Sequence, residues 1–391
     1  MPLIAQYAAI VLTAITSFAI GTLANFSDYI VWMYEDPNRG SSIISQRLEG
    51  TVTDFYKQNM FLHKTAVELT HAMSHEQKAG QILMPAWEKG TSVDQMTALL
   101  EKYSIGGVMV LRNDATRAQV QKLKQSTVKT VGETSIQGLV SIDAEPSLLR
   151  YRMPSSGYTT KTDTLASPEL AFSAGKTIAQ IIASYGYNYN FAPVYDTDLN
   201  KAIIGDRAFG RDAEDIHSKA SVFTKAMTEN NIISTAKHFP GHGAVVGDTH
   251  KNLQIVPSDL PELEAFRAAI NDRVPSVMVG HLAIEGGQYD TAGRPATLSQ
   301  NVIEKLLRKD LGFKGLVITD GMNMGALDSF SDQDMQAINA GVDIVLMPRE
   351  LEITHETLVE RMKNDIQFEE KVNEKVYRIV RMKLVQAWAD Q

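Results

Sequence analysis

The stretch GLVITDGMNMGAL, residues 315–327, begins as a short apolar run rich in β-branched residues and then reaches an aspartate, Asp320. Runs of this kind are typical of buried strands in a parallel sheet. Amphipathic stretches with a helical period separate it from seven similar runs. The eight runs are GQILMPA (80–86), GGVMVLR (106–112), GLVSIDA (138–144), YNFAPVYD (189–196), IISTAKHF (232–239), PSVMVGH (275–281), GLVITD (315–320) and VDIVLMP (342–348). Eight βα units over about 300 residues predict an α/β fold, a (β/α)8 TIM barrel.

The flanking sequence sets the limits of the predicted domain. Ser74 begins SHEQ, a capping-box pattern that predicts the start of a first helix. Residues 371–388 have the pattern of a last helix that closes the barrel. We therefore expect a single catalytic domain over residues 74–391, preceded by a spacer with one or two helices over residues 28–73.

The N-terminal segment is apolar. Residues 1–27 contain no charged residue, and residues 8–24 have the composition of a signal-peptide core or a marginal membrane span. A basic region ahead of the core is missing. We expect residues 1–27 to be a signal peptide or membrane anchor, which would make the protein exported, periplasmic or membrane-anchored. The alternative is a buried N-terminal helix in a cytoplasmic protein.

Composition excludes several classes of function. The formal net charge is -8 and no Lys/Arg block stands out, so the electrostatic footprint of a nucleic-acid-binding protein is missing. The chain has no Cys, which excludes disulfides, thiolate zinc sites and a cysteine nucleophile. The expected partner is a small or uncharged molecule, and the oligomeric state stays open.

Polar residues at the ends of the predicted strands are the candidates for catalysis, because a (β/α)8 barrel carries its active site at the carboxyl ends of its strands. These residues are Asp143, Asp196, the pair Lys237 and His238, His281 and Asp320. Each has a structural alternative: a helix N-cap, a buried ion pair or a satisfied core histidine. Their convergence on one rim favours a catalytic site.

Retaining hydrolysis of a glycosidic bond needs a carboxylate nucleophile and a proton donor to the leaving oxygen. Asp320 is the candidate nucleophile. The Gly-rich stretch KHFPGHGAVVGDTH, residues 237–250, holds one carboxylate, Asp248, two positions before His250. A histidine can donate and accept a proton at neutral pH, and an adjacent aspartate can orient it. Asp248 and His250 therefore predict an acid/base dyad on a loop over the barrel mouth.

The stretch AKHFPGHGAVVGDTH, residues 236–250, resembles the signature of family-three glycoside hydrolases. The similarity is to their β-N-acetylglucosaminidase branch, in which KHFPGHG is followed by an Asp-Ser-His or similar dyad. Further motifs resemble other parts of the family, and together they cover about residues 74–391. They are MSHEQKAGQILM (73–84), NFAPVYD (190–196), IIGDRAFGRD (203–212), PATLS (295–299) and GFKGLVITDGMNMGAL (312–327).

The resemblance implies a role for each site residue. Asp320 would be the nucleophile, and His250 the acid/base, oriented by Asp248. Four residues would hydrogen-bond sugar hydroxyls or the acetamido group: Asp143, Arg207, Lys237 and His238. His281 ends a strand and is a further candidate for the pocket. The expected enzyme is a retaining exo-acting β-N-acetylglucosaminidase that acts on a GlcNAc-containing, cell-wall (peptidoglycan-derived) glycan and needs no cofactor or metal.

The sequence departs from the family after the third predicted strand. The family commonly continues from its aspartate into Glu-Gly-Gly-x-Val-x-Arg, whereas this chain reads SIDAEPSLLRYRM over residues 141–153. Pro146 and Ser147 replace the two glycines. Because proline fixes φ and lacks an N–H, we expect a different pocket wall beyond Asp143.

Several alternatives stay open. A β-glycoside phosphorylase fits a histidine acid/base, because a carboxylate in that place would repel incoming phosphate. A β-glucosidase of the same family and a non-catalytic, membrane-tethered glycan-binding protein are also compatible with the motifs. A metal-dependent hydrolase would use His238, His242, Asp248 and His250, but the chain has neither an HxH strand end nor an HExxH helix.

Overall fold

The computed structural model describes residues 48, 50–245 and 247–389. The predicted signal peptide or anchor, residues 1–27, lies outside this range, as do residues 28–47 of the predicted spacer. Both therefore stay predictions. Within the described range, every helix is too short or too polar to cross a bilayer.

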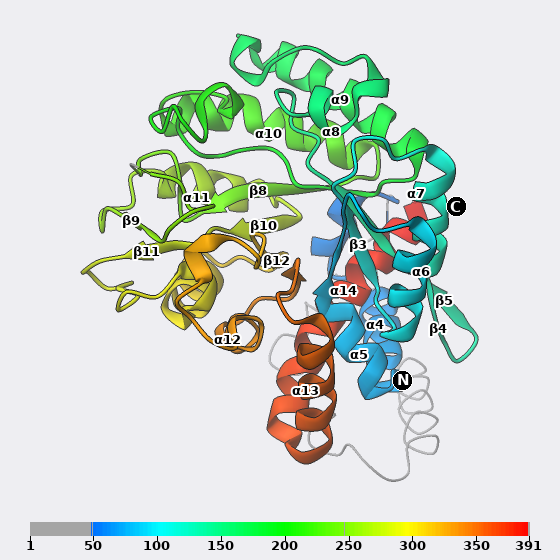
Figure 1. The fold of residues 1–391 in the computed structure, drawn as a ribbon. Coiled ribbons are helices and arrows are strands. Elements are labelled where there is room, and N and C mark those ends of the chain that lie inside the picture. The colour runs from blue at the N-terminus through cyan, green and yellow to red at the C-terminus, as the bar shows by residue number, and fades with distance from the viewer. Residues whose placement is uncertain (1–47, 49, 246, 390–391) are drawn as a thin grey trace, which may run out of the picture. The chain divides into compact units, whose positions relative to one another are not determined.

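A curled parallel sheet forms the centre of the described chain (Figure 1). Seven strands follow one another in the order β12-β10-β8-β7-β6-β3-β2, each parallel to its neighbours. Their bounds are β2 (Ala86–Trp87), β3 (Gly107–Val110), β6 (Leu139–Ile142), β7 (Tyr189–Asn190), β8 (Ile233–Phe239), β10 (Ser276–Val279) and β12 (Leu316–Thr319).

A second parallel pair forms a separate two-stranded sheet. It consists of β1 (Leu83–Met84) and β13 (Val345–Leu346). Pro85 alone separates β1 from β2, and an isolated bridge pairs Ile318 of β12 with Ile344. Seven of the eight predicted runs each contain one of these strands, and the first run, 80–86, contains β1 and the first residue of β2. The prediction of an α/β fold with a parallel sheet is confirmed.

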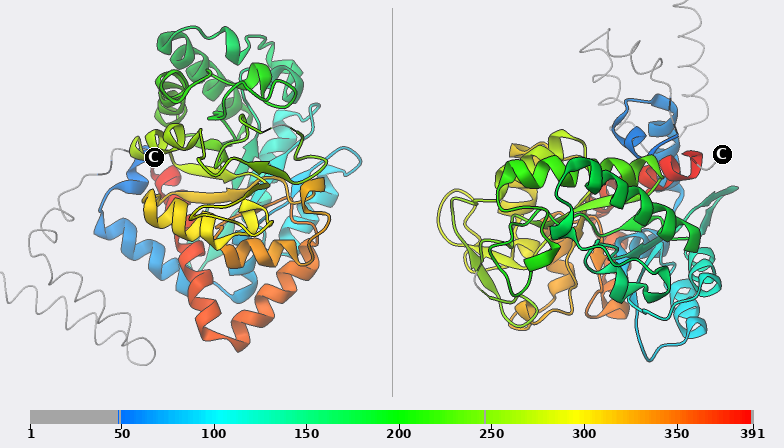
Figure 2. Two further views of the ribbon diagram at one scale, coloured as in Figure 1. Left: turned by 90° about the vertical axis from the view of Figure 1, so that its left-hand side faces the viewer. Right: turned by 90° about the horizontal axis from the view of Figure 1, so that it is seen from above.

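Helices alternate with most strands of the parallel sheet and cover it (Figures 1 and 2). The helices are α6 (Val93–Lys102), α7 (Arg117–Ser126), α9 (Pro168–Tyr185), α10 (Ala213–Glu229), α11 (Leu263–Asn271), the π-helical segment η6 (Asn301–Asp310), α12 (Gln333–Ala340), α13 (Leu351–Asn364) and α14 (Ile366–Ala389). Short 3-10 turns are η2 (Pro154–Ser156), η3 (Thr162–Thr164), η4 (Gly205–Arg207), η5 (Ala296–Leu298) and η7 (Gly325–Leu327).

The predicted helix start at Ser74 is confirmed. The backbone N–H of Gln77 donates to the Ser74 hydroxyl, and the Gln77 side chain accepts from the Ser74 N–H, which completes a capping box. This cap begins α5 (His75–Ile82), which leads directly into β1. The predicted first strand, 80–86, is therefore too long at its start, because residues 80–82 still belong to α5.

Part of the predicted spacer packs on the same hydrophobic core. It contains η1 (Val52–Tyr56) and α4 (Met60–Ala72). The Arg381 side chain on α14 donates to the Phe55 carbonyl at 3.0 Å, and the Tyr56 hydroxyl donates to the Val274 carbonyl at 2.6 Å. These contacts tie residues 52–56 to the last helix and to the entry of β10.

Three features of the fold are not predicted from the sequence. An antiparallel hairpin of β4 (Lys129–Val131) and β5 (Thr134–Ile136) precedes β6. A parallel pair of β9 (Gln254–Val256) and β11 (Leu282–Ile284) lies in the loops after β8 and β10. The short helix α8 (Leu149–Arg152) follows β6 and begins just after Pro146 and Ser147, the two residues that depart from the family pattern.

Buried charges stabilise the amino-terminal side of the sheet. Asp343, which is fully buried, accepts hydrogen bonds from Arg308 at 2.6 Å, Arg378 at 2.8 Å and the Val317 N–H at 2.8 Å. Two arginines thus face this one buried carboxylate, so the negative charge of Asp343 is compensated. These groups lie at the start of β12, away from the strand ends that carry the catalytic candidates.

Candidate active site

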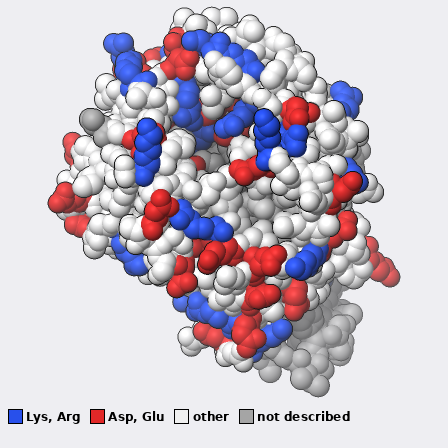
Figure 3. All heavy atoms as spheres, viewed as in Figure 1, with Lys and Arg blue, Asp and Glu red and all other residues white. Residues whose placement is uncertain are grey.

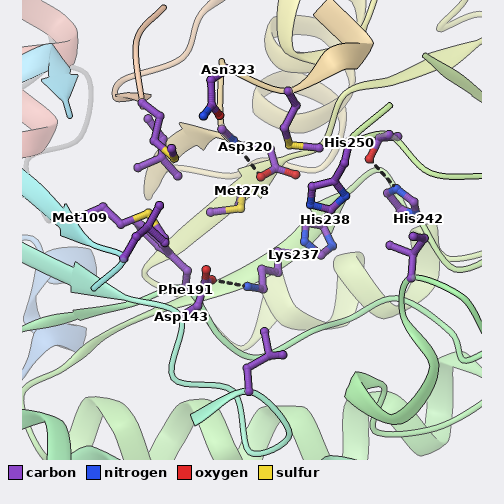
Figure 4. A pocket seen from close by; sticks show the side chains of 18 of the residues that line it. Met109, Asp143, Phe191, Lys237, His238, His242, His250, Met278, Asp320 and Asn323 are labelled. Carbon is purple, nitrogen blue, oxygen red and sulfur yellow. Dashed lines mark hydrogen bonds and ion pairs between the residues drawn. The ribbon is translucent and has the colours of Figure 1, made fainter. Parts of the chain in front are cut away.

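A cavity of about 310 Å³ opens at the carboxyl ends of the strands (Figure 4). Figure 3 shows this face hollowed, with charged side chains of both signs around the hollow. The polar lining residues are Glu88, Asp143, Arg152, Arg207, Lys237, His238, His242, Thr249, His250, Asp320 and Asn323. The apolar lining includes Met109, Leu111, Leu148, Phe191, Met278, Met324 and Met347. Six of the eight predicted site residues line this cavity directly, and Asp248 contacts one of them.

Asp320 follows β12 and points into the cavity. Its own N–H pairs with the Val279 carbonyl, and one carboxylate oxygen accepts the Gly321 N–H at 2.8 Å. Burial alone would raise the pKa of this carboxyl, but the charge of His238 and the Gly321 N–H outweigh burial and hold the pKa below its ordinary value. Asp320 is therefore ionised at neutral pH, as a nucleophile must be.

A charged chain forms one wall of the cavity. The Lys237 ammonium contacts Asp143 at 2.7 Å and Glu145 at 2.6 Å, and Arg207 holds Glu145 through two bonds of 2.8 Å. Burial opposes ionisation of Glu145, but Arg207 and Lys237 hold the pKa of Glu145 far below its ordinary value. The ion pair between Lys237 and Asp143 thus exists, and both of its members also face the cavity.

Arg152 is a site residue that the sequence did not reveal. It ends α8, lines the cavity and donates to the second carboxylate oxygen of Asp143 at 3.2 Å. Asp143 is therefore held between two cations, Lys237 and Arg152. Fixed charges of this kind can bind sugar hydroxyls through directed hydrogen bonds.

Asp196, a fully buried carboxylate that follows β7, orients the His238 side chain. Asp196 contacts His238 Nδ1 at 2.6 Å and also accepts the backbone N–H groups of His238 and His242. Burial opposes ionisation of Asp196, but the two histidines lower the pKa of this carboxyl. Because Nδ1 is engaged, the ring nitrogen of His238 left for a ligand is Nε2.

The Gly-rich turn after β8 is built around a second buried carboxylate, Glu262. It accepts the N–H of Thr197 at 2.6 Å and the N–H of Gly243 at 3.0 Å. A Cβ on Gly243 would lie 2.2 Å from the Thr197 carbonyl, and one on Gly241 would lie 2.3 Å from a Glu262 oxygen. Burial, and then the charge of Asp196, raises the pKa of Glu262 to about 7. Close approach to Glu262 thus explains both glycines.

The structure brings Asp248 and His250 together. Asp248 contacts His250 Nδ1 at 2.8 Å and also accepts the His250 N–H at 2.9 Å. Burial opposes ionisation of Asp248, but the bonds from His250 hold the pKa of Asp248 below its ordinary value. An ionised partner at Nδ1 leaves Nε2 of His250, whose side chain is 63% exposed, to face the cavity. Their catalytic roles stay a prediction.

His281 lies beneath the site and is not among the cavity-lining residues. It is fully buried, with Nδ1 2.9 Å from the Thr297 hydroxyl and Nε2 2.9 Å from the Gly321 carbonyl. A carbonyl only accepts, so Nε2 carries the proton, and burial lowers the pKa of this imidazole. His281 therefore contacts the residue that follows Asp320 and can position it. Because its side chain does not line the cavity, the prediction that His281 binds the sugar is wrong.

The histidines of the alternative metal site have other partners. His238 contacts Asp196, His242 Nε2 lies 2.8 Å from the Thr249 hydroxyl, and His250 contacts Asp248. Over the part of the chain that the structure describes, no group of three or more His, Asp or Glu side chains is arranged to hold a metal ion.

Comparison with known proteins gives a consistent result. Residues 74–382 match the family described as Glycosyl hydrolase family 3 N terminal domain. A β-hexosaminidase of Methylobacillus flagellatus is 29% identical over 282 residues, which cover 67% of this chain and 78% of that protein. A β-hexosaminidase of Xanthomonas euvesicatoria pv. vesicatoria is 32% identical over 268 residues, or 63% of this chain and 78% of that protein.

Solved structures of similar fold carry related names. A glycoside hydrolase family 3 β-N-acetylglucosaminidase from Paenibacillus sp. superposes with a TM-score of 0.72 at 30% identity over 82% of this chain. The chain spans 64% of that protein's length. A β-N-acetylhexosaminidase from Beutenbergia cavernae superposes with a TM-score of 0.71 at 26% identity. The match covers 80% of this chain and 98% of the chain of that protein.

Proposed function

Because the chain belongs to glycosyl hydrolase family 3, we propose that it is a retaining exo-acting enzyme that hydrolyses terminal β-linked N-acetylglucosamine. The protein is a glycoside hydrolase, and the names of its relatives support this choice of sugar. The observation that carries the mechanism is that Asp320 and His250 border one cavity from two different elements. A nucleophile and a proton donor on separate elements can approach opposite sides of one glycosidic bond.

The first chemical step uses both groups. The Asp320 carboxylate attacks the anomeric carbon, the glycosidic bond breaks, and the leaving oxygen takes the proton from His250 Nε2. In the second step His250 accepts a proton from water, which attacks the anomeric carbon and releases Asp320. Asp248 supports both steps, because its negative charge stabilises the imidazolium and fixes the ring orientation.

The charged wall would bind the non-reducing sugar. Asp143, Lys237, Arg207 and His238 line the cavity and are held by buried partners, so their donors and acceptors are fixed before the sugar arrives. We include Arg152 in this set, because it lines the cavity beside Asp143. Preorganised polar groups raise affinity, since little side-chain entropy is lost on binding.

The proposal extends to the sheet and to the biological substrate. The pairing of β1 with β13 and the bridge between Ile318 and Ile344 support closure into a (β/α)8 barrel, with β1 and β2 as one strand interrupted at Pro85.

The apolar segment 1–27 supports export or membrane anchoring. An exported enzyme of this specificity would act on GlcNAc-containing cell-wall glycans.

A fluorinated N-acetylglucosaminyl substrate tests the proposal by trapping the covalent intermediate. We expect mass spectrometry to find the label on Asp320 and NMR to find product that retains the β configuration. Asp320→Asn should bind the sugar but take no label. The exposed Asp94→Asn is the matched control, because it makes the same change on α6. A label on another residue, or inverted product, would contradict the proposed mechanism.

A second assay separates hydrolysis from phosphorolysis. Turnover of nitrophenyl β-N-acetylglucosaminide is measured with and without inorganic phosphate. Hydrolysis gives free sugar at the same rate in both buffers. A glycosyl phosphate that forms only with phosphate present would establish the β-glycoside phosphorylase alternative, and preference for a nitrophenyl glucoside would establish the β-glucosidase.

A further inference from the structure

We infer that the acid/base dyad works only while its loop is docked on the segment that follows the nucleophile, and that Thr249, His242 and Gly325 are positioning residues for this docking. The dyad loop is residues 248–250, and the nucleophile segment is residues 320–328. The inference rests on the proposed function, because it assigns to the loop the acid/base role of His250.

The first interaction that docks the dyad loop is a side-chain contact. Thr249, between the two dyad residues, is 1% exposed, and its hydroxyl lies 2.8 Å from Nε2 of His242. His242 is 2% exposed, and its backbone N–H donates to Asp196 at 2.8 Å. The loop is thus bound to a histidine that the Gly-rich turn already holds in place.

The second interaction that docks the dyad loop consists of hydrogen bonds between its backbone and that of the nucleophile segment. The Gly325 N–H donates to the His250 carbonyl at 3.0 Å, and the Ala326 N–H donates to the Thr249 carbonyl at 3.2 Å. A Cβ on Gly325 would lie 2.8 Å from the His250 carbonyl oxygen and 2.6 Å from that of Lys251. Only glycine at position 325 lets the dyad loop come this close to the nucleophile segment.

The nucleophile segment is itself firmly held. His281 contacts the Gly321 carbonyl at 2.9 Å. Arg349 donates to the Met322 carbonyl at 3.3 Å and to the Met324 carbonyl at 3.1 Å, and it binds Asp328 at 2.8 Å. A loop docked here takes its position from the same segment that places the Asp320 carboxylate.

This arrangement divides the work between neighbouring residues. Thr249 is buried and anchors the loop, while the His250 side chain stays 63% exposed and free to meet the leaving group. If either the contact between Thr249 and His242 or the backbone hydrogen bonds from residues 325 and 326 are lost, the loop is docked for a smaller fraction of the time. Proton donation falls with that fraction, whereas attack by Asp320 does not depend on it.

Substitution at Thr249 tests the inference. The readout is kcat/KM for two substrates: a β-linked N-acetylglucosamine disaccharide, which needs proton donation, and 2,4-dinitrophenyl β-N-acetylglucosaminide, whose leaving group needs none. Thr249→Val removes the hydroxyl at nearly constant volume. We expect it to lower the disaccharide value about 5- to 10-fold and to change the dinitrophenyl value by less than about twofold. Thr249→Ser restores the hydroxyl and should rescue the disaccharide value.

Gly325→Ala tests the second docking interaction in the same pair of assays, and we expect the same selective loss. Its melting temperature is measured alongside; if the variant is too unstable to assay, the Thr249 pair alone decides. Equal losses on both substrates in Thr249→Val, or equal behaviour of Thr249→Val and Thr249→Ser, would overturn the inference.

His250→Ala separates this inference from the proposed function. It should lose about 10² to 10⁴ in kcat/KM for the disaccharide while keeping most of its value for the dinitrophenyl substrate. If His250→Ala is selective and Thr249→Val is not, the docking inference fails alone. If His250→Ala slows both substrates equally, His250 is not the acid/base and both proposals fail.

Discussion

Ser147 explains how the chain departs from its family beyond Asp143. Its side chain is 2% exposed, and its hydroxyl donates to the Asp206 carbonyl at 2.5 Å while accepting the Thr162 N–H at 2.9 Å. The loop after β6 is thereby tied to the loop after β7. Arg207, the next residue after Asp206, holds Glu145 in the cavity wall. A hydroxyl in place of a family glycine thus supports a residue proposed to bind sugar.

Ser147→Gly restores the family's residue and removes this tie. We expect KM for nitrophenyl β-N-acetylglucosaminide to rise about 3- to 10-fold with a smaller change in kcat, because Arg207 is less well held and the reacting groups are untouched. Ser155→Gly, an exposed serine in η2, is the control. If both variants change KM alike, Ser147 has no special part in holding the wall.

At the scale of elements, the Gly-rich turn shows how an irregular segment becomes a fixed part of the site. Glu262 lies just before α11 and binds backbone donors at Thr197, Gly243 and Ala244. A buried carboxylate with several N–H donors replaces the hydrogen bonds that a helix or sheet would supply. The turn that holds His242 is therefore ordered without regular secondary structure.

Gly243→Ala should disrupt this turn, because the added Cβ meets the Thr197 carbonyl and Glu262. We expect a loss of about 1–3 kcal/mol in the free energy of unfolding, measured by urea titration, and a larger loss of kcat/KM than the stability change explains. Gly132→Ala, in the hairpin of β4 and β5 where a Cβ meets nothing within 4 Å, should leave kcat/KM unchanged. Equal kcat/KM in the two variants would contradict the role of the turn.

The elements were predictable from the sequence where local pattern determines them. The buried parallel strands are apolar, β-branched runs. Asp143 and Asp320 directly follow β6 and β12, and Lys237 and His238 are the last two residues before β8 ends at Phe239. The hairpin of β4 and β5 also has a local signal, a glycine in its turn, Gly132, whose φ is +58°.

Other features depend on contacts that no local pattern encodes. β9 and β11 pair across two separate loops, and Glu262 reaches the turn from the start of α11. Arg152 stands one residue beyond the place where the family pattern has its arginine, so the motif did not point to it. His281 ends a predicted strand like the other candidates, but its ring contacts Thr297 and Gly321, and the position in the sequence does not predict that direction.

At the scale of the whole molecule, α14 places a lysine amine in the core. Lys383 is 1% exposed, and its ammonium donates to the Gly106 carbonyl at 2.7 Å and to the Gln81 side chain at 2.5 Å. Burial, and then the charge of Lys129, lowers the pKa of Lys383 from 10.5 to about 7. Between these two values the unfolded chain holds a proton that the folded chain lacks, so the free energy of unfolding rises with pH across this range.

Lys383→Met should remove this pH dependence. Between pH 7 and pH 9 we expect the wild type to gain about 2 kcal/mol in unfolding free energy relative to the variant, measured by urea titration at each pH. The absolute stability of the variant also falls, since Gln81 and Gly106 lose a donor, so the slope with pH is the decisive quantity. The exposed Lys122→Met should keep the wild-type slope. A variant with an unchanged slope would show that Lys383 keeps its ordinary pKa.

The pairing of Leu83 with Val345 also bears on how the protein is made. A ribosome delivers β1 long before β13, so the edge of β1 that pairs with β13 has no such partner until β13 has been made. Parallel pairings between such distant residues form slowly, and an apolar strand edge left open in the meantime is prone to aggregate. Nascent chains that stop before residue 345 should therefore bind chaperones strongly, and release from them should coincide with completion of β13 and α14.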